Sequence, residues 1–404
     1  MNQLNRNFAL RVEATCLAQP DRPVMFHRDR SISYAELMRR IDGWTVALRA
    51  KGVGPGDTVA LWLPNSPAFV TAFLATLRLG AIAVPLGVLL RPREVRQRLA
   101  IASPAALVTT PALAGELGVI DTALLAVEPD GGGLESSDRT PVVPRAEEDI
   151  AVLIFTSGTV GDARAAELTH EGILWNGRAL AHGLALGPQD VQLAAAPLSH
   201  VLGMTGIMNA TLLTGGALAL MERFDAPSAL PFMARTATSG IVGAPPMFAA
   251  LVREARHLGG APPLRFAMAG GAAMATELAR DVKETFGCVL RDGYGMSEVG
   301  GGIAHTHVDV LPRPRSVGQP LPGSQVRIVD LSTGAPVPIG ERGEVQVRSP
   351  SVMRGYRGND EATRAAIDAD GWLSTGDIGF LDGRLPVPGG SEEGAHHPVG
   401  LQRV

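Results

Sequence analysis

The most informative stretch of the chain is Ile154-Phe155-Thr156-Ser157-Gly158-Thr159-Val160-Gly161. Its apolar start is typical of a buried strand, and the glycines and hydroxyl residues that follow are typical of a tight turn. Such a turn offers backbone N–H groups and hydroxyls to phosphate oxygens. It has neither the ending of a Walker A loop nor a G-x-G-x-x-G fingerprint. Taken alone, the stretch indicates either a phosphate site or an ordinary turn.

Upstream of this stretch, the pattern predicts strands and helices in alternation. Ser33 and Glu36 form a capping box that opens an amphipathic helix, which ends near Gly52. Residues 58–63 read as a buried strand, and residues 65–67, Asn-Ser-Pro, are typical of the start of the next helix. Further elements are expected at residues 82–84 (strand), 93–102 (helix) and 106–109 (strand).

The alternation predicts an α/β fold, because strands joined by helices form mainly parallel sheets. We expect two mainly parallel sheet-and-helix subdomains at residues 1–149 and 150–314, with a linker-like segment at residues 128–148. Short β-rich pieces separated by glycine and proline turns predict a small β-rich subdomain at residues 315–384, with strands at 325–329 and 343–348. Residues 385–404 lack a hydrophobic period and are expected to be disordered.

Composition limits the classes of function. The net charge of −4 gives no basic field that would attract nucleic acid or an anionic membrane. The most apolar stretch, residues 70–90, is broken by Arg78, Pro85 and several glycines, so no stable membrane insertion is expected. Two cysteines, Cys16 and Cys288, fit a reducing compartment. The sequence therefore predicts a soluble, cytoplasmic protein.

Several segments in order resemble the adenylate-forming (AMP-binding) superfamily, which includes acyl-CoA synthetases, aryl-CoA ligases, luciferases and peptide-synthetase adenylation domains. The most specific match is Asp292-Gly293-Tyr294-Gly295-Met296-Ser297-Glu298. The other matching segments are residues 156–165, 168–170, 197–203, 269–272, 316–320, 343–344, 355–356 and 374–377. The resemblance runs from about residue 7 to 385 and is strongest to the acyl-CoA synthetase or fatty-acid–CoA ligase type.

The resemblance implies an ATP site. By this resemblance, Tyr294 stacks on the adenine and Asp377 accepts hydrogen bonds from the ribose hydroxyls. Glu298 binds Mg²⁺, an ion that prefers hard oxygen ligands. A core tyrosine, a turn aspartate and a solvated surface glutamate are the alternatives for the same three residues. The implied nucleotide-binding residues are Thr156, Ser157, Gly158, Thr159, Gly161, Arg164, Gly271, Ala272, Asp292, Tyr294, Gly295, Ser297 and Asp377.

The resemblance also implies the chemistry. A carboxylate attacks the α-phosphate of ATP to give an acyl-adenylate, and the thiol of CoA then takes the acyl group, with Thr156, His200 and Glu298 as catalytic residues. From sequence alone, His200 reads as a satisfied histidine at a helix start. The implied acyl-pocket residues are His200, Met204, Val242, Gly243 and Ala272. Most of these are small or apolar, which favours a fatty or other apolar acid over an amino acid.

Two departures from the family pattern leave alternatives open. In the phosphate loop Val160, Ala163, Arg164 and Ala165 replace threonine, proline, lysine and glycine, which predicts weaker ATP binding or slower chemistry. Family members continue past residue 385 into a small domain that bears a catalytic lysine, whereas no lysine follows Lys283. We therefore expect impaired acyl-CoA formation, or a separate chain that supplies the domain. A non-catalytic nucleotide- or acyl-binding remnant and an adenylation domain for a carrier protein are the alternatives.

Overall fold

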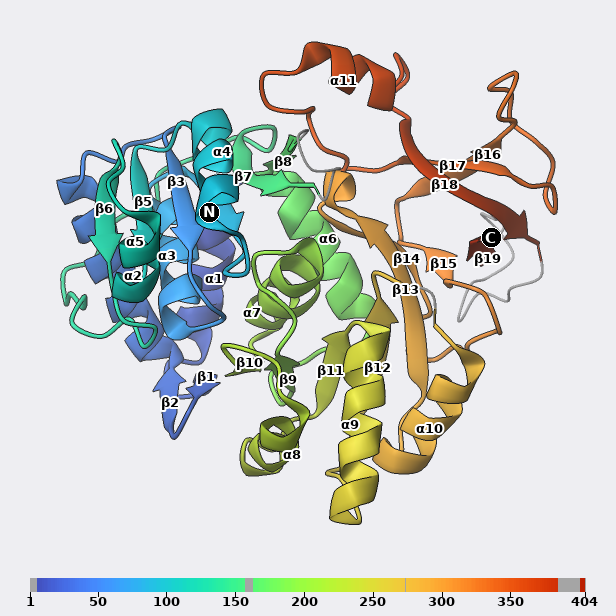
Figure 1. Cartoon of the computed structure of the whole chain (residues 1–404), viewed down its shortest axis with the longest axis horizontal. Helices are drawn as coiled ribbons and strands as arrows, with labels where there is room; N and C mark the ends of the chain where they lie inside the picture. Colours follow the sequence, from blue (N-terminus) through green and yellow to red (C-terminus); the bar gives the residue numbers. More distant parts are fainter. Residues whose placement is uncertain (1–5, 157–162, 273, 384–399, 404) are drawn as a thin grey trace.

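The computed structural model describes residues 6–156, 163–272, 274–383 and 400–403. Figure 1 shows two α/β regions side by side, the first blue to teal and the second green to yellow, with a small orange-to-red sheet beyond the second. The two larger sheets contain six and nine strands, and the small sheet contains four. This confirms the predicted α/β class with its added β-rich region.

The six-stranded sheet has the order β6-β5-β3-β4-β7-β8 and is parallel except where β8 meets β7. Its core strands are fully buried runs of Val, Leu and Ala, as expected for a sheet covered on both faces. Its strands are β3 (Thr58–Trp62), β4 (Ile82–Leu86), β5 (Ala106–Thr109), β6 (Ala123–Ala126), β7 (Ile150–Phe155) and β8 (Ala165–Thr169). The helices of this region are α1 (Phe8–Ala18), α2 (Tyr34–Ala50), α3 (Pro67–Arg78), α4 (Pro92–Ala102) and α5 (Pro111–Leu117).

The nine-stranded sheet has the order β15-β14-β13-β12-β11-β9-β10-β1-β2 and is parallel from β13 to β1. Its strands are β1 (Pro23–His27), β2 (Arg30–Ser33), β9 (Val191–Ala194), β10 (Ala217–Leu220), β11 (Gly240–Gly243), β12 (Phe266–Gly270), β13 (Leu290–Met296), β14 (Gly301–His305) and β15 (Gln319–Pro320). Its helices are α6 (His170–Gly183), the π-helix η1 (Leu202–Asn209), α7 (Ala210–Thr214), α8 (Ala226–Arg235), α9 (Pro245–Leu258), α10 (Thr276–Phe286) and the 3₁₀ turn η2 (Ser297–Val299).

The small sheet is antiparallel, with the order β16-β17-β18-β19. It consists of β16 (Gln325–Val329), β17 (Gly343–Arg348), β18 (Leu373–Asp382) and β19 (Gly400–Arg403), and α11 (Asp360–Ala366) precedes β18. The two strands predicted in this part of the sequence coincide with β16 and β17.

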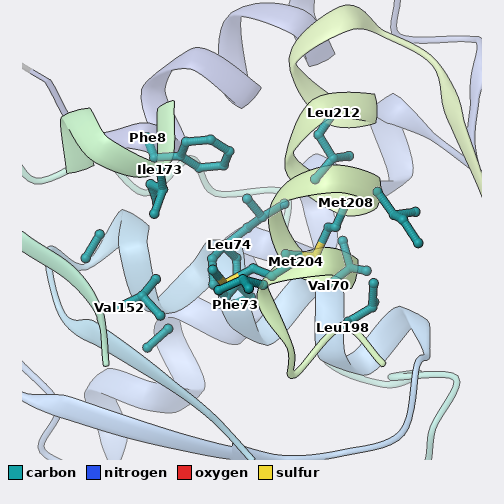
Figure 2. Packing of buried hydrophobic residues seen from close by; sticks show 14 of the residues in the cluster. Phe8, Val70, Phe73, Leu74, Val152, Ile173, Leu198, Met204, Met208 and Leu212 are labelled. Carbon is teal, nitrogen blue, oxygen red and sulfur yellow. The ribbon is translucent and has the colours of Figure 1, made fainter. Parts of the chain in front are cut away.

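One hydrophobic core joins the two large sheets. Figure 2 shows Phe73 of α3, Ile173 of α6 and Met204 of the π-helix among its buried side chains. Full burial of side chains of this size stabilises the fold by about 1.5–3 kcal/mol each. The shared core holds the second sheet and its π-helix at a fixed position relative to the strand ends of the first.

Two expectations about the organisation of the chain need correction. The predicted boundary between residues 149 and 150 is not a boundary between sheets, because β7 and β8 extend the first sheet and β1 and β2 join the second. Pairing of β1 with β10 links segments far apart in the sequence, which local periodicity does not encode. The tail was expected to be disordered, but residues 400–403 form β19 against β18. Residues 385–399 lie outside the described residues.

The helices that the structure describes include none that is both long enough and apolar enough to cross a bilayer. Cys16 and Cys288 are buried free thiols.

Candidate active site

A cavity of about 950 Å³ lies where residues of both large sheets meet residues of the small one. Thr156 follows β7, and Gly271 and Ala272 follow β12, so these residues lie at the carboxyl ends of parallel strands. Ligands of open α/β sheets characteristically bind at such ends. Its other predicted lining residues are Arg164, His200, Asp292, Tyr294, Gly295, Ser297, Glu298 and Asp377.

Tyr294 and Asp377 connect two sheets across the cavity. The Tyr294 hydroxyl donates a 2.7 Å hydrogen bond to Oδ2 of Asp377, which places a residue of β13 against one of β18. The Asp377 backbone N–H in turn donates to the Thr375 hydroxyl at 3.1 Å, which is typical of a local turn. The pair presents an aromatic ring beside a carboxylate, a combination suited to a nucleoside base and its ribose.

Gly295 is required by a close approach of two strands. A Cβ added there would lie 1.9 Å from the Gly301 carbonyl oxygen. Any larger residue would push β13 away from β14. Tyr294 and Met296, which flank Gly295 and line the cavity, would be displaced as well. The glycine in this motif is therefore explained by strand packing.

Glu298 follows β13 in the 3₁₀ turn, with 9% of its surface exposed. The Tyr356 hydroxyl donates a 2.9 Å hydrogen bond to Oε1 of Glu298. The guanidinium carbon of Arg164 lies 5.5 Å from the centroid of the Tyr356 ring. Burial, and then the Glu298 charge, raise the pKa of Tyr356, so its hydroxyl keeps its proton as a donor. A carboxylate and a guanidinium are thus held on the same tyrosine.

The donor set fits Mg²⁺ on a nucleotide better than a metal cage made of protein alone. Within the described part of the chain, no three His, Cys, Asp or Glu residues gather as a potential metal site. Mg²⁺ bound to ATP takes most of its ligands from phosphates and water, and one or two carboxylates complete them. Glu298, which lines the cavity as a hard oxygen donor, meets that need.

Asp292 is a partly buried carboxyl group on β13 that lines the same cavity. Burial raises its pKa to about 6, and a hydrogen bond from the Gly293 backbone partly offsets this. At pH 7 the group is mostly ionised and accepts hydrogen bonds. It gains a donor proton in mildly acidic solution.

His200 lies just before the π-helix, and its exposed surface faces the cavity. The Leu202 backbone N–H donates to its Nδ1 at 3.3 Å. Burial lowers the pKa of the imidazole, which favours the neutral ring. With Nδ1 as the acceptor, the ring proton is on Nε2, where it can be donated to a carboxylate or phosphate oxygen.

The predicted acyl-pocket residues separate into two groups. His200 and Ala272 line the cavity, whereas Met204, Val242 and Gly243 are buried and do not belong to its wall. In Figure 2 Met204 lies within the hydrophobic core. The wall consists instead of Leu180, Leu202, Gly206, Met268, Gly302, Ala304 and Val317, with Val242 behind Gly206. Met204 belongs to the π-helix, of which Leu202 and Gly206 line the cavity, and Val242 and Gly243 belong to β11.

Four predicted phosphate-loop residues, Ser157, Gly158, Thr159 and Gly161, lie outside the described residues, as does Val160. At the two ends of this loop, the Thr156 backbone N–H donates to the Arg164 carbonyl at 3.0 Å. Both end residues line the cavity.

Sequence reasoning gave no role to two polar residues of the cavity, Tyr356 and Arg315. Tyr356 belongs to a segment that carries the family resemblance, and an aromatic residue between glycine and arginine was the available signal. Arg315 has a φ of 65°, in the left-handed region that arginine rarely adopts. Nothing in the local sequence indicates that conformation.

A family model described as "AMP-binding enzyme" matches residues 12–357. Feruloyl-CoA synthase of Amycolatopsis sp is 33% identical over 366 residues, which cover 90% of this chain and 74% of the relative. 4-Coumarate–CoA ligase 5 of Oryza sativa subsp. japonica is 32% identical over 368 residues, covering 86% of this chain and 67% of the relative. The ATP-bound crystal structure of MatB from Rhodopseudomonas palustris superposes with a TM-score of 0.86 at 26% identity, covering 99% of this chain and 79% of that one. The chain belongs to the AMP-binding enzyme family, among its ATP-dependent acid–CoA ligases.

Proposed function

We propose that the protein activates a fatty or other apolar carboxylic acid with ATP, forming an acyl-adenylate, and passes the acyl group to CoA. The observation that carries this proposal is the composition of the cavity wall, which contains a polar set and an apolar set of residues. We call these sets, by the chemistry of their side chains, the polar end (Thr156, Arg164, Asp292, Tyr294, Glu298, Tyr356 and Asp377) and the apolar end (Leu180, Leu202, Gly206, Met268, Gly302, Ala304 and Val317).

The polar end suits the nucleotide. Tyr294 offers its ring to the adenine, Asp377 accepts from ribose hydroxyls and Asp292 accepts from an exocyclic amine. Arg164 and Thr156 line the same cavity, and their guanidinium and hydroxyl would serve the phosphates, where developing charge needs cations and donors. Glu298 would hold Mg²⁺, which neutralises the phosphate charge when bound.

Neutral His200 lies in the same cavity as both groups of residues. Its Nε2–H would donate a hydrogen bond to the acid's carboxylate or to an oxygen of the α-phosphate. This contact would hold the carboxylate close to the α-phosphate. In the first half-reaction a carboxylate oxygen bonds to the α-phosphorus and pyrophosphate leaves. This step requires orientation and charge stabilisation, and no protein nucleophile.

The apolar end suits the hydrocarbon part of the acid. The side chains and glycine backbone of this wall carry no charge, so an amino acid's ammonium would find no carboxylate there. The names of similar proteins include feruloyl-CoA synthase, 4-coumarate–CoA ligase and sulfoacetate–CoA ligase. These relatives therefore act on acids of different kinds, and the acid must be determined by experiment.

ATP–pyrophosphate exchange tests the adenylation half-reaction without a thiol acceptor. The panel would contain acetate, octanoate, palmitate, ferulate, malonate and leucine, each with and without Mg²⁺. We expect exchange with the apolar acids and little with malonate or leucine. If malonate or leucine supported faster exchange than the apolar acids, the proposal of an apolar substrate would be wrong. Absent exchange with intact AMP binding would support a nucleotide-binding protein without ligase activity.

A further inference from the structure

The segment at residues 354–357 pairs with β8, although the two are far apart in the sequence. The Glu167 backbone N–H donates to the Gly355 carbonyl at 2.9 Å, and the Arg354 N–H donates back to the Glu167 carbonyl at 2.8 Å. A third backbone hydrogen bond, 2.8 Å long, runs from the Arg357 N–H to the Ala165 carbonyl. These bonds hold the backbone on both sides of Tyr356 against β8, the strand that follows the predicted phosphate loop.

The side chain of Glu167 reinforces this pairing. It is buried, and its Oε2 accepts from Nη2 and Nε of Arg354 at 2.7 and 2.9 Å. Its Oε1 accepts from Nη1 of Arg357 at 3.1 Å. One carboxylate thus binds the residues two before and one after Tyr356. Charge-assisted hydrogen bonds of this kind are the strong ones in proteins.

The Tyr356 side chain connects two charged groups of the polar end, Glu298, proposed for the metal, and Arg164, proposed for the phosphates. Its hydroxyl donates to Glu298, and its ring faces the guanidinium of Arg164. The Tyr356 backbone N–H is held as well, by the Thr363 hydroxyl of α11 at 2.9 Å. The tyrosine is therefore fixed along its backbone, and its side chain touches both a cation and a carboxylate of the polar end.

We propose that Tyr356 is a positioning residue, which orients the Glu298 carboxylate toward the metal and holds Arg164 toward the phosphates. The inference rests on the proposed function, because it acts through Glu298 and Arg164. The hydroxyl and the ring have separate tasks. The hydroxyl fixes one carboxylate oxygen and leaves the other for the metal, and the ring supports the guanidinium by a cation–π contact.

Tyr356→Phe separates these tasks, because it removes the hydroxyl and keeps the ring. Loss of a group that orients a metal ligand typically costs 10–100-fold in metal affinity or activity. We expect the Mg²⁺ concentration for half-maximal exchange to rise about tenfold, while the binding of AMP, which needs no metal, stays unchanged. Tyr356→Leu, which also removes the ring, should raise the KM for ATP even at saturating Mg²⁺.

Tyr34→Phe is the matched control, because it also removes one buried tyrosine hydroxyl, which donates to the Gly216 carbonyl at 2.8 Å. Exchange would be measured against Mg²⁺, and Mn²⁺ binding in the presence of ATP would be measured by electron paramagnetic resonance, a readout that needs no turnover. We expect Tyr356→Phe to weaken Mn²⁺ binding about tenfold. Tyr34→Phe should change thermal stability alone.

Glu298→Gln separates this inference from the proposed function. If Glu298→Gln weakens Mn²⁺ binding and Tyr356→Phe does not, Tyr356 has no positioning role and the proposed function stands. If neither variant changes Mn²⁺ binding, Glu298 is no metal ligand, and both the metal assignment and the role of Tyr356 are wrong. Glu167→Gln weakens the contacts with both arginines and should shift the Mg²⁺ dependence in the same direction, by about threefold.

Discussion

The two ends of the cavity are built in different ways. At the polar end, side chains from segments far apart in the sequence are joined by individual hydrogen bonds, Tyr294 to Asp377 and Tyr356 to Glu298. At the apolar end, Leu180 of α6, Gly206 of the π-helix and other small or branched residues define only a shape. A charged group that is displaced by an ångström loses much of its effect, whereas apolar walls tolerate changes that conserve volume. Substitutions at the polar end should therefore lower ATP–pyrophosphate exchange with every acid. Substitutions at the apolar end should change which acids support exchange.

Glu298→Ala should have the largest effect. Removal of the proposed metal carboxylate takes away transition-state stabilisation worth several kcal/mol, so exchange should fall at least about a hundredfold with every acid tested. Mg²⁺ titrations of exchange and of ATP binding would measure the loss. The fold should remain, because the backbone carbonyl of Glu298, which accepts from the Met353 N–H at 2.7 Å, is kept.

Glu341→Ala serves as its control, because this exposed glutamate lies in the turn before β17 and does not line the cavity. It should leave exchange unchanged. Equal Mg²⁺ dependence in Glu298→Ala and the native protein would remove Glu298 from the site.

Gly206→Leu should have a selective effect at the apolar end. A Cβ at Gly206 would meet Val242, Leu180 and Leu202 at 3.5–4.0 Å, so alanine fits there. We expect a longer side chain to take up space beside Leu180 and Leu202, which line the cavity. One methylene in an apolar pocket is worth about 1–3 kcal/mol, so exchange with palmitate or ferulate should fall about tenfold or more.

Acetate provides the internal comparison for that variant, since it does not reach far along the wall, and Gly206→Ala provides the matched control. Exchange with acetate should change little in either variant. A uniform loss across all acids in Gly206→Leu would show that Gly206 maintains the fold of the π-helix and does not select the acid.

Among the described residues that the sequence pointed to, those expected to bind the nucleotide line the cavity more consistently than those expected in the acyl pocket. Tyr294, Glu298 and Asp377 were identified because polar residues in a fixed order carry the family resemblance. Met204 and Val242 were expected in the acyl pocket from their position in the family pattern, whereas Met204 lies in the hydrophobic core and Val242 lies in β11, behind Gly206. Tyr356 gained its role only through pairing with β8, a contact between residues far apart in sequence.

The same reasoning applies to the fold. The buried runs of β3 and β5 and the Ser33 cap of α2 are local features, and all three were predicted close to their observed bounds. The addition of β1 and β2 to the second sheet depends on long-range pairing, which no local pattern reveals.

The smallest of the predicted effects is the effect of Asp292→Asn on the stability of the fold. The folded-state pKa of about 6 lies above the usual value for aspartate, so the folded protein binds the proton more tightly than the unfolded chain. Stability then falls as pH rises from about 4 to 6, and the full cost of the buried charge is present above that range. Asparagine has the same size and no charge. The variant should be more stable than the native protein at pH 7.5, by on the order of 1 kcal/mol because the group is only partly buried.

Asp330→Asn should change stability in the opposite direction, because the pKa of this carboxyl group is lowered and not raised. Hydrogen bonds from Ser332 and Thr333 lower the pKa of Asp330 to about 2. That contribution is present above about pH 4 and is lost as the pH falls toward 2, so asparagine should lower the melting temperature at pH 7.5. Thermal melts of both variants between pH 4 and 7.5 would measure these effects. The advantage of Asp292→Asn should be about 1–2 °C at pH 7.5 and should vanish near pH 4. If Asp292→Asn raised the melting temperature equally at both pH values, the gain in stability would come from packing and not from removal of the buried charge.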